Sequence, residues 1–409
     1  MTTFIKIAWR NILRNKKRSS ITISAVALGL GALIFIWAFV EGAHTQMIEN
    51  YTSLMTSHLQ VHAKGFHQRP QLEKFIDNPR SMLEQLENYP PVKAASLRIK
   101  SDGLISSAES SSGVLIIGID PVKELSVSRL AQQVARGKFL SPEDNDKVII
   151  GDTLAENLNI GLNEKVVVMG QAFDGSIAAG AFYVGGLLDT GVDEVDKGLV
   201  LINYTAAQKL LVMGDRASEA AIRLSSAAES LAVSEQLKPG LEKYGYEVLP
   251  WQEISVSFLQ WIEFDNGFIW IIVIITMIVV AGGILNTILM GVLERTREFG
   301  IIMALGTRPR QVIATVAWES VFLGLLGIAF GLAIGLGLTF YFQRFGIDLT
   351  VVAGALNSFY MDSVIYPRFS PSYICVTTVL VLIISIIASI YPAWHASRLK
   401  PIEAIRSMG

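Results

Sequence analysis

The stretch ERTREFGIIMALG, residues 294–306, lies between two long apolar runs of the sequence. Its first half is charged and its second half is mostly apolar, so the stretch is amphipathic. A charged side chain at the centre of a bilayer costs about 2.5–3.5 kcal/mol on insertion scales, so these residues cannot lie in hydrocarbon. We therefore expect a short helix at a membrane face, with its apolar residues packed down and its charges exposed to a partner outside the bilayer.

The composition is that of a membrane protein. Of the 409 residues, 51% are hydrophobic and only 17% are charged, which is too apolar for an ordinary soluble protein. The formal net charge of -2 argues against nucleic acid as a partner. The single cysteine, Cys375, lies in an apolar run and excludes an intrachain disulfide.

Four apolar segments are long enough to cross a bilayer, which requires about 20 residues. The predicted spans are residues 19–41, 266–293, 312–343 and 372–391. Basic residues gather at the N-terminus, after the second span and in the tail, so the positive-inside rule places both termini in the cytoplasm. Residues 294–311 are then a cytoplasmic helix and loop, 344–371 a short outer loop and 392–409 a cytoplasmic tail.

Residues 1–18 are predicted to form a cytoplasmic amphipathic helix. Lys6, Arg10 and Arg14 recur at every fourth position, so they share one helical face, as expected for a helix on an anionic leaflet. The alternative, the basic start of a signal peptide, is disfavoured because the next apolar run is too long and is followed by no obvious small-residue cleavage site.

Residues 42–265 are predicted to form a mixed α/β domain outside the cytoplasm, because they follow one membrane crossing. The segment is large enough for a core of its own. Expected strands are 114–119, 147–150, 165–169, 182–187 and 199–202, and expected helices are 79–88, 153–158, 206–211 and 226–244.

Three glycines, Gly327, Gly331 and Gly335, repeat at every fourth residue of the third predicted span. They share one helical face and would let another helix approach closely. The alternative is the ordinary enrichment of glycine in membrane helices. Glu319, near the start of the same span, is interpreted as an interfacial solvated side chain, or alternatively as a buried functional carboxylate.

Three histidines, His58, His62 and His67, follow the first span closely. We interpret them as structural or surface residues, because a zinc site would need further ligands and no cysteine or convincing fourth ligand lies nearby. The sequence has no Walker-A motif, no G-x-S-x-G and no H-E-x-x-H. An enzymatic activity is therefore not expected, and if the protein does work, the energy must come from another chain.

The stretch ERTREFGIIMALGTRPRQV resembles the cytoplasmic loop of the FtsX/MacB-like permeases of ABC transporters, whose pattern is E-R-x-x-E-I-G-I-x-[RK]-A-[LIM]-G. Phe299 replaces the usual Ile, and Met303 replaces the usual basic residue. The opening AWRNILRNKKRSSIT and the tail YPAWHASRLKPIEAIR also look like the family's start and closing motif. The residues that fit the loop and the tail are Glu294, Arg295, Glu298, Gly300, Ile301, Ala304, Leu305, Gly306, Pro392, Ala393, Ala396, Ser397, Pro401, Glu403, Ala404 and Arg406.

The resemblance implies a permease subunit of the bacterial inner membrane whose loop helix is the coupling helix that docks on an ATPase. The implied coupling residues are Glu294, Arg295, Arg297, Glu298, Phe299, Gly300, Leu305 and Gly306, and the tail motif is represented by Pro392, Ser397, Pro401, Glu403 and Arg406. Two copies of a separate ATPase subunit would bind ATP and Mg²⁺, and this chain would bind no cofactor. A second permease subunit, identical or different, would complete the complex.

Several phrases of the outer domain look most like those of lipoprotein-releasing permeases. They are HLQVHAKGF at 58–66, LIIGIDPVKE at 115–124 and VIIGDTLAENLNIGLNEKVVV at 148–168. The resemblance therefore implies that ATP-driven motion passes to the outer domain and extracts lipoproteins from the membrane. The alternatives are efflux of an antibiotic, peptide or other amphiphile with a periplasmic adaptor, and regulation of a cell-wall hydrolase without transport.

Overall fold

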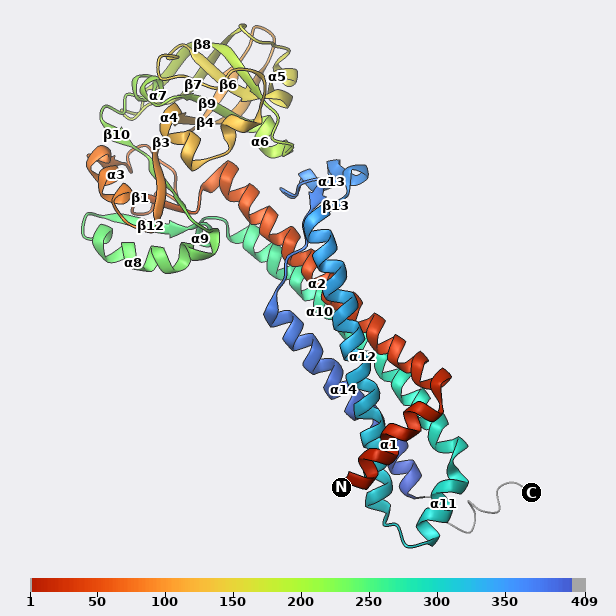
Figure 1. The fold of residues 1–409 in the computed structure, drawn as a ribbon. Coiled ribbons are helices and arrows are strands. Elements are labelled where there is room, and N and C mark those ends of the chain that lie inside the picture. Colours follow the sequence, from red (N-terminus) through yellow and green to blue (C-terminus); the bar gives the residue numbers. More distant parts are fainter. Residues whose placement is uncertain (1, 399–409) are drawn as a thin grey trace. The chain divides into compact units, whose positions relative to one another are not determined.

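The computed structural model describes residues 2–398, which divide into two compact units (Figure 1). Unit 1 consists of the described parts of Met1–His44, Ile262–Asp348 and Val364–Gly409. Unit 2 consists of Thr45–Trp261 and Leu349–Ser363. Unit 2 therefore takes in the middle of the predicted outer loop, which the sequence pattern did not assign to the α/β domain.

Unit 1 is built from helices, two of which include residues of unit 2, namely 45–51 and 256–261. They are α1 (Thr2–Arg14), α2 (Lys16–Tyr51), α10 (Val256–Glu294), α11 (Thr296–Ala304), α12 (Pro309–Phe345) and α14 (Pro371–Ser397), and a short pair of strands, β13 (Ile347–Asp348) and β14 (Val364–Ile365), follows α12. In the part of the chain that is described, α2, α10, α12 and α14 are long and apolar enough to cross a membrane. All four extend beyond the predicted spans, because backbone hydrogen bonding continues into the less apolar flanks.

The long helices of unit 1 share one apolar core. It includes Leu30 and Trp37 of α2, Val280 of α10, Val316 of α12 and Val381 of α14. Helices α12 and α14 are also joined by a hydrogen bond, in which Ser320 Oγ donates to Ser385 O at 2.7 Å. Small residues at this contact let the two backbones approach closely, as packing in lipid requires.

Unit 2 contains the remaining elements. They are a π-helical turn (Thr52–Thr56), β1 (Leu59–Ala63), β2 (Ile76–Asp77), α3 (Pro79–Glu87), β3 (Val92–Ser106), β4 (Ser111–Ile119), α4 (Pro121–Val127), a 3₁₀ turn (Leu130–Gln133), β5 (Val134–Gly137), β6 (Lys147–Gly151), α5 (Asp152–Leu158), β7 (Lys165–Gln171), β8 (Ile177–Leu188), α6 (Asp193–Gly198), β9 (Leu199–Asn203), α7 (Tyr204–Leu210), β10 (Arg216–Ala217), β11 (Glu219–Leu224), a 3₁₀ turn (Ala227–Glu229), α8 (Ser230–Glu242), β12 (Tyr246–Pro250), α9 (Trp251–Ile254), a 3₁₀ turn (Thr350–Val352) and α13 (Ala353–Asn357). All five predicted strands and all four predicted helices of this region are present.

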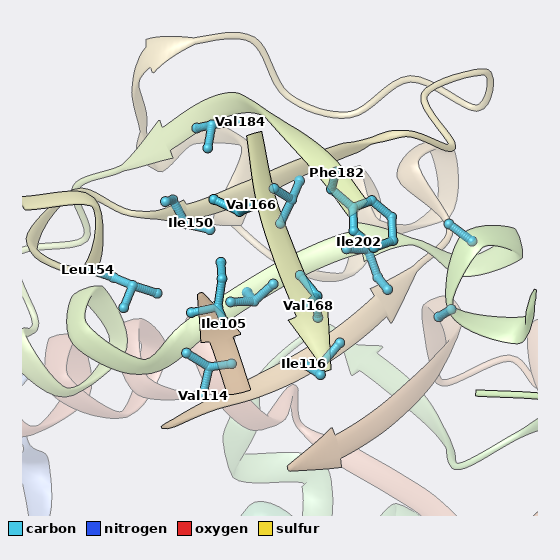
Figure 2. Close-up of a cluster of buried hydrophobic side chains, with 14 of the residues drawn as sticks. Ile105, Val114, Ile116, Ile150, Leu154, Val166, Val168, Phe182, Val184 and Ile202 are labelled. Carbon is cyan, nitrogen blue, oxygen red and sulfur yellow. The ribbon is translucent and has the colours of Figure 1, made fainter. Parts of the chain in front are cut away.

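A mixed sheet of ten strands runs through unit 2 in the order β12-β1-β11-β3-β4-β9-β6-β8-β5, and β7 pairs with β3 and β8. Strand β3 is long enough, at 15 residues, to pair with β11 and β4 along its length and with β7 at its end. One apolar cluster gathers around β4, β6, β7, β8 and β9, and includes Ile116, Ile150, Val168 and Ile202 (Figure 2). A second cluster lies around β1, β11, α3 and α8, and a third includes Ile119, Leu130 and Leu201.

Candidate functional site

The predicted coupling segment forms a separate short helix, α11. Helix α10 ends at Glu294, and Arg295, which lies outside helical geometry at φ −112° and ψ 17°, precedes α11. At the other end, Gly306 N donates to Met303 O and Thr307 N donates to Ile302 O. Gly306 has φ +95°, and this pair of bonds with a left-handed glycine is the Schellman arrangement that closes a helix.

One face of α11 is packed and the other is exposed. Phe299 and Gly300 are buried in unit 1. Ile301 and Ile302 are exposed, and Leu305 is almost entirely so, at 82%. Arg297 is also exposed, and it has no ion-pair partner within residues 2–398. The surface that α11 presents therefore combines these apolar side chains with Arg297 and with Glu298, whose side chain is 59% exposed.

Two acidic residues of the segment pair with the N-terminal part of the chain. Both carboxylate oxygens of Glu298 accept from Arg14 Nη2 at 3.1 Å, and Glu294 Oε2 accepts from Arg18 Nη1 at 2.8 Å. We expected these carboxylates to face an outside partner. The structure gives each an intrachain partner as well, because α1 and the start of α2 bring two arginines within reach, while Glu298 stays 59% and Glu294 48% exposed.

Glu319 lies at the centre of a half-buried ionic cluster. Its carboxylate is 3.6 Å from Arg295 Nη1 and 3.9 Å from Arg18 Nη2, and only 14% of its side chain is exposed. Burial lowers the pKa of Arg295, and the Glu319 carboxylate opposes that effect. Glu319 is thus not a solvated interfacial side chain, and Arg295 is enclosed and not available to a partner.

Helix α1 packs against α12 and so completes the site. Ala8 and Ile12 of α1 are buried, and the rings of Trp9 and Phe322 meet edge to face with centroids 5.5 Å apart. The site therefore unites α1, α2, α10, α11 and α12. Sequence analysis placed Arg14 on a basic helical face, but nothing in the sequence pairs Arg14 or Arg18 with a particular carboxylate.

The three glycines of α12 lie directly against α2. A Cβ added at Gly327 would come within 2.5 Å of the Cβ of Val26, and one at Gly331 within 3.0 Å of the carbonyl oxygen of Ala27. At Gly335 it would meet Gly31 O at 3.0 Å. The absence of side chains at these positions is what lets α12 and α2 approach.

The predicted tail motif is only partly described. Pro392 is buried within α14, and Ser397 Oγ donates to Trp394 O at 2.8 Å near its end. Pro401, Glu403 and Arg406 lie outside the described residues.

The three histidines of the outer domain do not converge on a metal site. Within residues 2–398, no group of three or more His, Cys, Asp or Glu side chains is placed to hold an ion. His58 Nδ1 accepts from the backbone N–H of Leu224 at 3.1 Å, and His62 Nε2 lies 2.9 Å from Gln60 Oε1. Both rings are buried parts of the fold.

Two family models match this chain, one in each part. The family model described as MacB-like periplasmic core domain matches residues 19–239, and the model described as FtsX-like permease C-terminal matches residues 270–401. The periplasmic region of MacB from Actinobacillus actinomycetemcomitans, a crystal structure, aligns with 53% of this chain and 97% of its own, with 17% identity and a TM-score of 0.36.

Curated relatives match along most of the chain. The lipoprotein-releasing system transmembrane protein LolC of Neisseria meningitidis is 26% identical over 98% of each chain, and that of Xylella fastidiosa is 25% identical over 96% of each. The macrolide export ATP-binding/permease protein MacB of Nitrobacter winogradskyi is 24% identical over 96% of this chain and 58% of its own. The chain thus belongs to the ABC transporter permeases that combine a MacB-like periplasmic core domain with an FtsX-like permease domain.

Proposed function

We propose that this chain transmits ATP-driven motion from a separate ATPase subunit, which docks on α11, to its periplasmic domain, and thereby releases lipoproteins from the inner membrane. The observation that carries the first part is the exposed face of α11. Leu305, Ile301 and Ile302 form an apolar surface beside the cation of Arg297, on a helix too charged to lie in lipid. A buried apolar centre with a charged rim is what a protein interface requires.

The contacts of α11 supply a route for force. Glu298 and Glu294 fasten the segment to α1 and α2, and Arg295 fastens it to Glu319 of α12. Three helices therefore respond when α11 is displaced. ATP-driven closure of two ATPase subunits would shift a permease dimer between two arrangements that differ in their contacts with α11.

The choice of lipoprotein as cargo rests on the extent of the likeness. LolC relatives align with this chain over nearly their whole length, whereas the MacB relative aligns over 58% of its own length. Energetics restrict the route as well, since each acyl CH₂ moved into water costs about 0.8 kcal/mol. The assembled complex must therefore shelter the acyl chains in an apolar space. Efflux of another amphiphile is the alternative that the likeness to MacB favours.

The ATPase contact is tested with Leu305→Asp. We expect the variant to lose at least tenfold of its affinity for the ATPase subunit that co-purifies with the wild-type chain, because a charge would enter the apolar centre of the contact. Ile177→Asp is the matched control, since Ile177 is 87% exposed and belongs to unit 2. Equal ATPase binding by Leu305→Asp and the control would contradict docking at α11.

The cargo is tested by reconstituting the chain in proteoliposomes with its co-purifying ATPase and permease subunits. An acylated lipoprotein should leave the bilayer only when ATP is supplied, and the same protein without acyl chains should not depend on the complex. ATP-driven loss of a macrolide or peptide without lipoprotein release would favour efflux. Co-purification of a hydrolase activator, with no movement of either cargo, would instead indicate regulation of a cell-wall enzyme.

A further inference from the structure

Helix α10 packs into unit 1 along one side only. Its buried residues, among them Met277, Ile284 and Ile288, recur at helical spacing and belong to the apolar core of unit 1. The opposite side of the helix is exposed within the described part of the chain. In a membrane helix such a side contacts either lipid or another helix, and the residues on it distinguish the two cases.

The exposed side of α10 carries a continuous stripe of residues. They follow one another at steps of four, three, four and seven positions, and they are Ile275, Val279, Gly282, Asn286 and Leu293. A repeat of seven positions keeps side chains on one face of a helix, and two helices that pack with a small left-handed crossing use this repeat. The stripe therefore has the spacing of a helix-packing surface.

Asn286 lies within the hydrocarbon region of the membrane. It is eight positions before Glu294, the charged end of α10, which is about 12 Å along the axis at about 1.5 Å per residue. The hydrocarbon core of a bilayer is about 30 Å thick. The carboxamide side chain of asparagine is too short to reach the water at either surface from this depth.

The carboxamide of Asn286 also has no partner within the chain. The nearby hydroxyl groups of α10 bond to their own helix, since Thr276 Oγ1 donates to Ile272 O at 2.9 Å. Thr287 Oγ1 likewise donates to Gly283 O at 2.8 Å. The exposed side chain of Asn286 makes no hydrogen bond to another residue in the described part of the chain. A polar group left unpaired in lipid is costly, so the partner of this carboxamide must come from outside the chain.

Gly282 leaves room for another helix to approach. It lies one turn before Asn286 on the same stripe, and a Cβ added there would meet no atom within 4 Å among the described residues. The glycines of α12 differ, because a Cβ at Gly327 would overlap Val26 of α2. Small residues let two helices approach closely in lipid, and polar side chains then bond across the contact. Gly282 and Asn286 together therefore favour a helix over lipid as the neighbour of this stripe.

We propose that a second copy of this chain docks at the stripe, with α10 against α10 about a twofold axis. Two copies inserted with the same topology form a parallel pair, and a twofold axis then places the same residue of both copies opposite each other. A carboxamide has N–H donors and an acceptor oxygen, so two Asn286 side chains satisfy each other. Val279 and Leu293 pack beside them, and an asparagine at such a position fixes the register of the two helices. The contact is independent of ATPase docking at α11 and of the cargo.

Cysteine cross-linking of the full chain tests this contact. The chain is purified without other subunits and reconstituted in liposomes, with Cys375→Ser to remove its native thiol. Val279→Cys, on the stripe, should form a disulfide-linked dimer on mild oxidation. Ile274→Cys is the matched control and should not, because Ile274 is 57% exposed but lies roughly a third of a turn away from the stripe. Equal cross-linking of the two variants, or none with Val279→Cys, would overturn the proposal.

Energy transfer between fluorescently labelled copies in the same liposomes measures the dissociation constant of the dimer. Asn286→Leu should raise it by about threefold or more, whereas Asn286→Gln, which keeps the carboxamide, should raise it less. Gly282→Leu should raise it by about tenfold, because the added side chain holds the helices apart.

Gly337→Leu is the control for the glycine variant. Gly337 is an exposed glycine of α12 that also has no described atom within 4 Å of an added Cβ, so its dissociation constant should stay within about twofold of wild type. The proposal is overturned if Asn286→Leu dimerises as well as wild type, or if Gly337→Leu weakens the dimer as much as Gly282→Leu. A chain that stays monomeric until a different permease subunit is added would also overturn it.

Discussion

At the residue scale, Glu319 is a position where a single substitution would disturb a cluster of charges between helices. Its carboxylate lies between Arg18 and Arg295, and 6% of the Arg295 side chain is exposed. Removing one member of a buried ionic group leaves the others without a counter-charge, whereas replacing the group by apolar side chains can be neutral. The stability of this cluster therefore depends on the presence of all its charged members more than on any one contact.

We predict that Glu319→Gln lowers the free energy of unfolding by roughly 2 kcal/mol, because the enclosed Arg295 would lose its carboxylate partner, whereas Arg18 keeps Glu294. Unfolding in mixed micelles containing sodium dodecyl sulfate measures the change. The double variant Glu319→Leu with Arg295→Met should recover at least half of the loss, since it removes charges of both signs. A double variant as unstable as the single one would contradict the electrostatic explanation.

A second residue-scale prediction concerns His62. Burial, together with Lys100 and His67, lowers the pKa of His62 to about 4 from an ordinary value near 6.5, although Glu219 and the Ser218 backbone oppose the shift. Between these values the unfolded chain binds a proton that the folded chain does not bind. The contribution of His62 to stability is therefore complete above pH 6.5, decreases as the pH falls, and has lost roughly 3 kcal/mol at pH 4.

Wild type and His62→Gln, compared by unfolding at pH 7.5 and pH 4.5, isolate this contribution. A glutamine side chain at this position cannot titrate, so the stability difference between the two proteins should shift in favour of the variant at the lower pH. His58, whose pKa burial and Arg223 also lower to about 4, remains in both proteins and cancels. Parallel pH curves for the two proteins would show that the folded state accommodates a protonated His62.

At the element scale, the packing of α12 on α2 depends on side chains that are absent. A Cβ at Gly327 would overlap Val26, whereas a Cβ at Gly337, ten residues further along the same helix, would have no atom within 4 Å among the described residues. Substitutions at the two positions therefore separate the effect of helix propensity from the effect of contact between α12 and α2. Both would gain helix propensity on replacement by leucine.

We predict that Gly327→Leu destabilises the chain by about 2–3 kcal/mol, because the added side chain must force two helices apart. Gly337→Leu is the control and should change stability by less than about 1 kcal/mol in either direction. Thermal unfolding of the two variants in the same detergent gives the comparison. Equal destabilisation would indicate that glycine itself, through bending or flexibility, is what α12 requires.

The strands of unit 2 show, also at the element scale, where a sequence pattern is sufficient to predict an element. Strands β4, β6, β7, β8 and β9 were predicted from β-rich apolar runs, and each is present. Strand β3, the longest, was not predicted. Its sequence includes Ser96 and Arg98, which are fully or almost fully buried. A buried arginine is possible there because Glu124 and Glu219 neutralise it, and both come from distant parts of the chain.

At the scale of the whole molecule, the proposed function requires that α11 move together with α1. The Arg14–Glu298 pair is exposed on both sides, and such pairs contribute only about 0–1 kcal/mol to stability. Its loss should therefore affect transmission of force and leave folding almost unchanged.

We predict that Arg14→Glu lowers ATP-driven cargo release several-fold and that Arg14→Glu with Glu298→Arg restores it, because the reversed pair reconnects the two helices. Lys197→Glu, which breaks a comparably exposed pair with Asp193 in unit 2, should have no effect. Release measured in proteoliposomes distinguishes these cases. If the double variant stays defective, Arg14 acts through the membrane surface and not through Glu298.

The sequence by itself determined the class of this protein. Four long apolar segments, the amphipathic stretch 294–306 and the polar α/β region follow from hydropathy and periodicity, because lipid and water select residues locally. The family was recognisable from the same stretch and from the tail, since both are contiguous motifs.

Only the tertiary structure decided which charged side chains a partner protein could contact. Glu294, Arg295 and Glu298 looked alike in sequence, yet Arg295 is enclosed, whereas Glu294 and Glu298 pair with arginines and stay about half exposed beside apolar side chains such as Leu305. Ion pairs arise from residues that are far apart along the chain, and only the packed fold brings those residues within a few ångströms of each other.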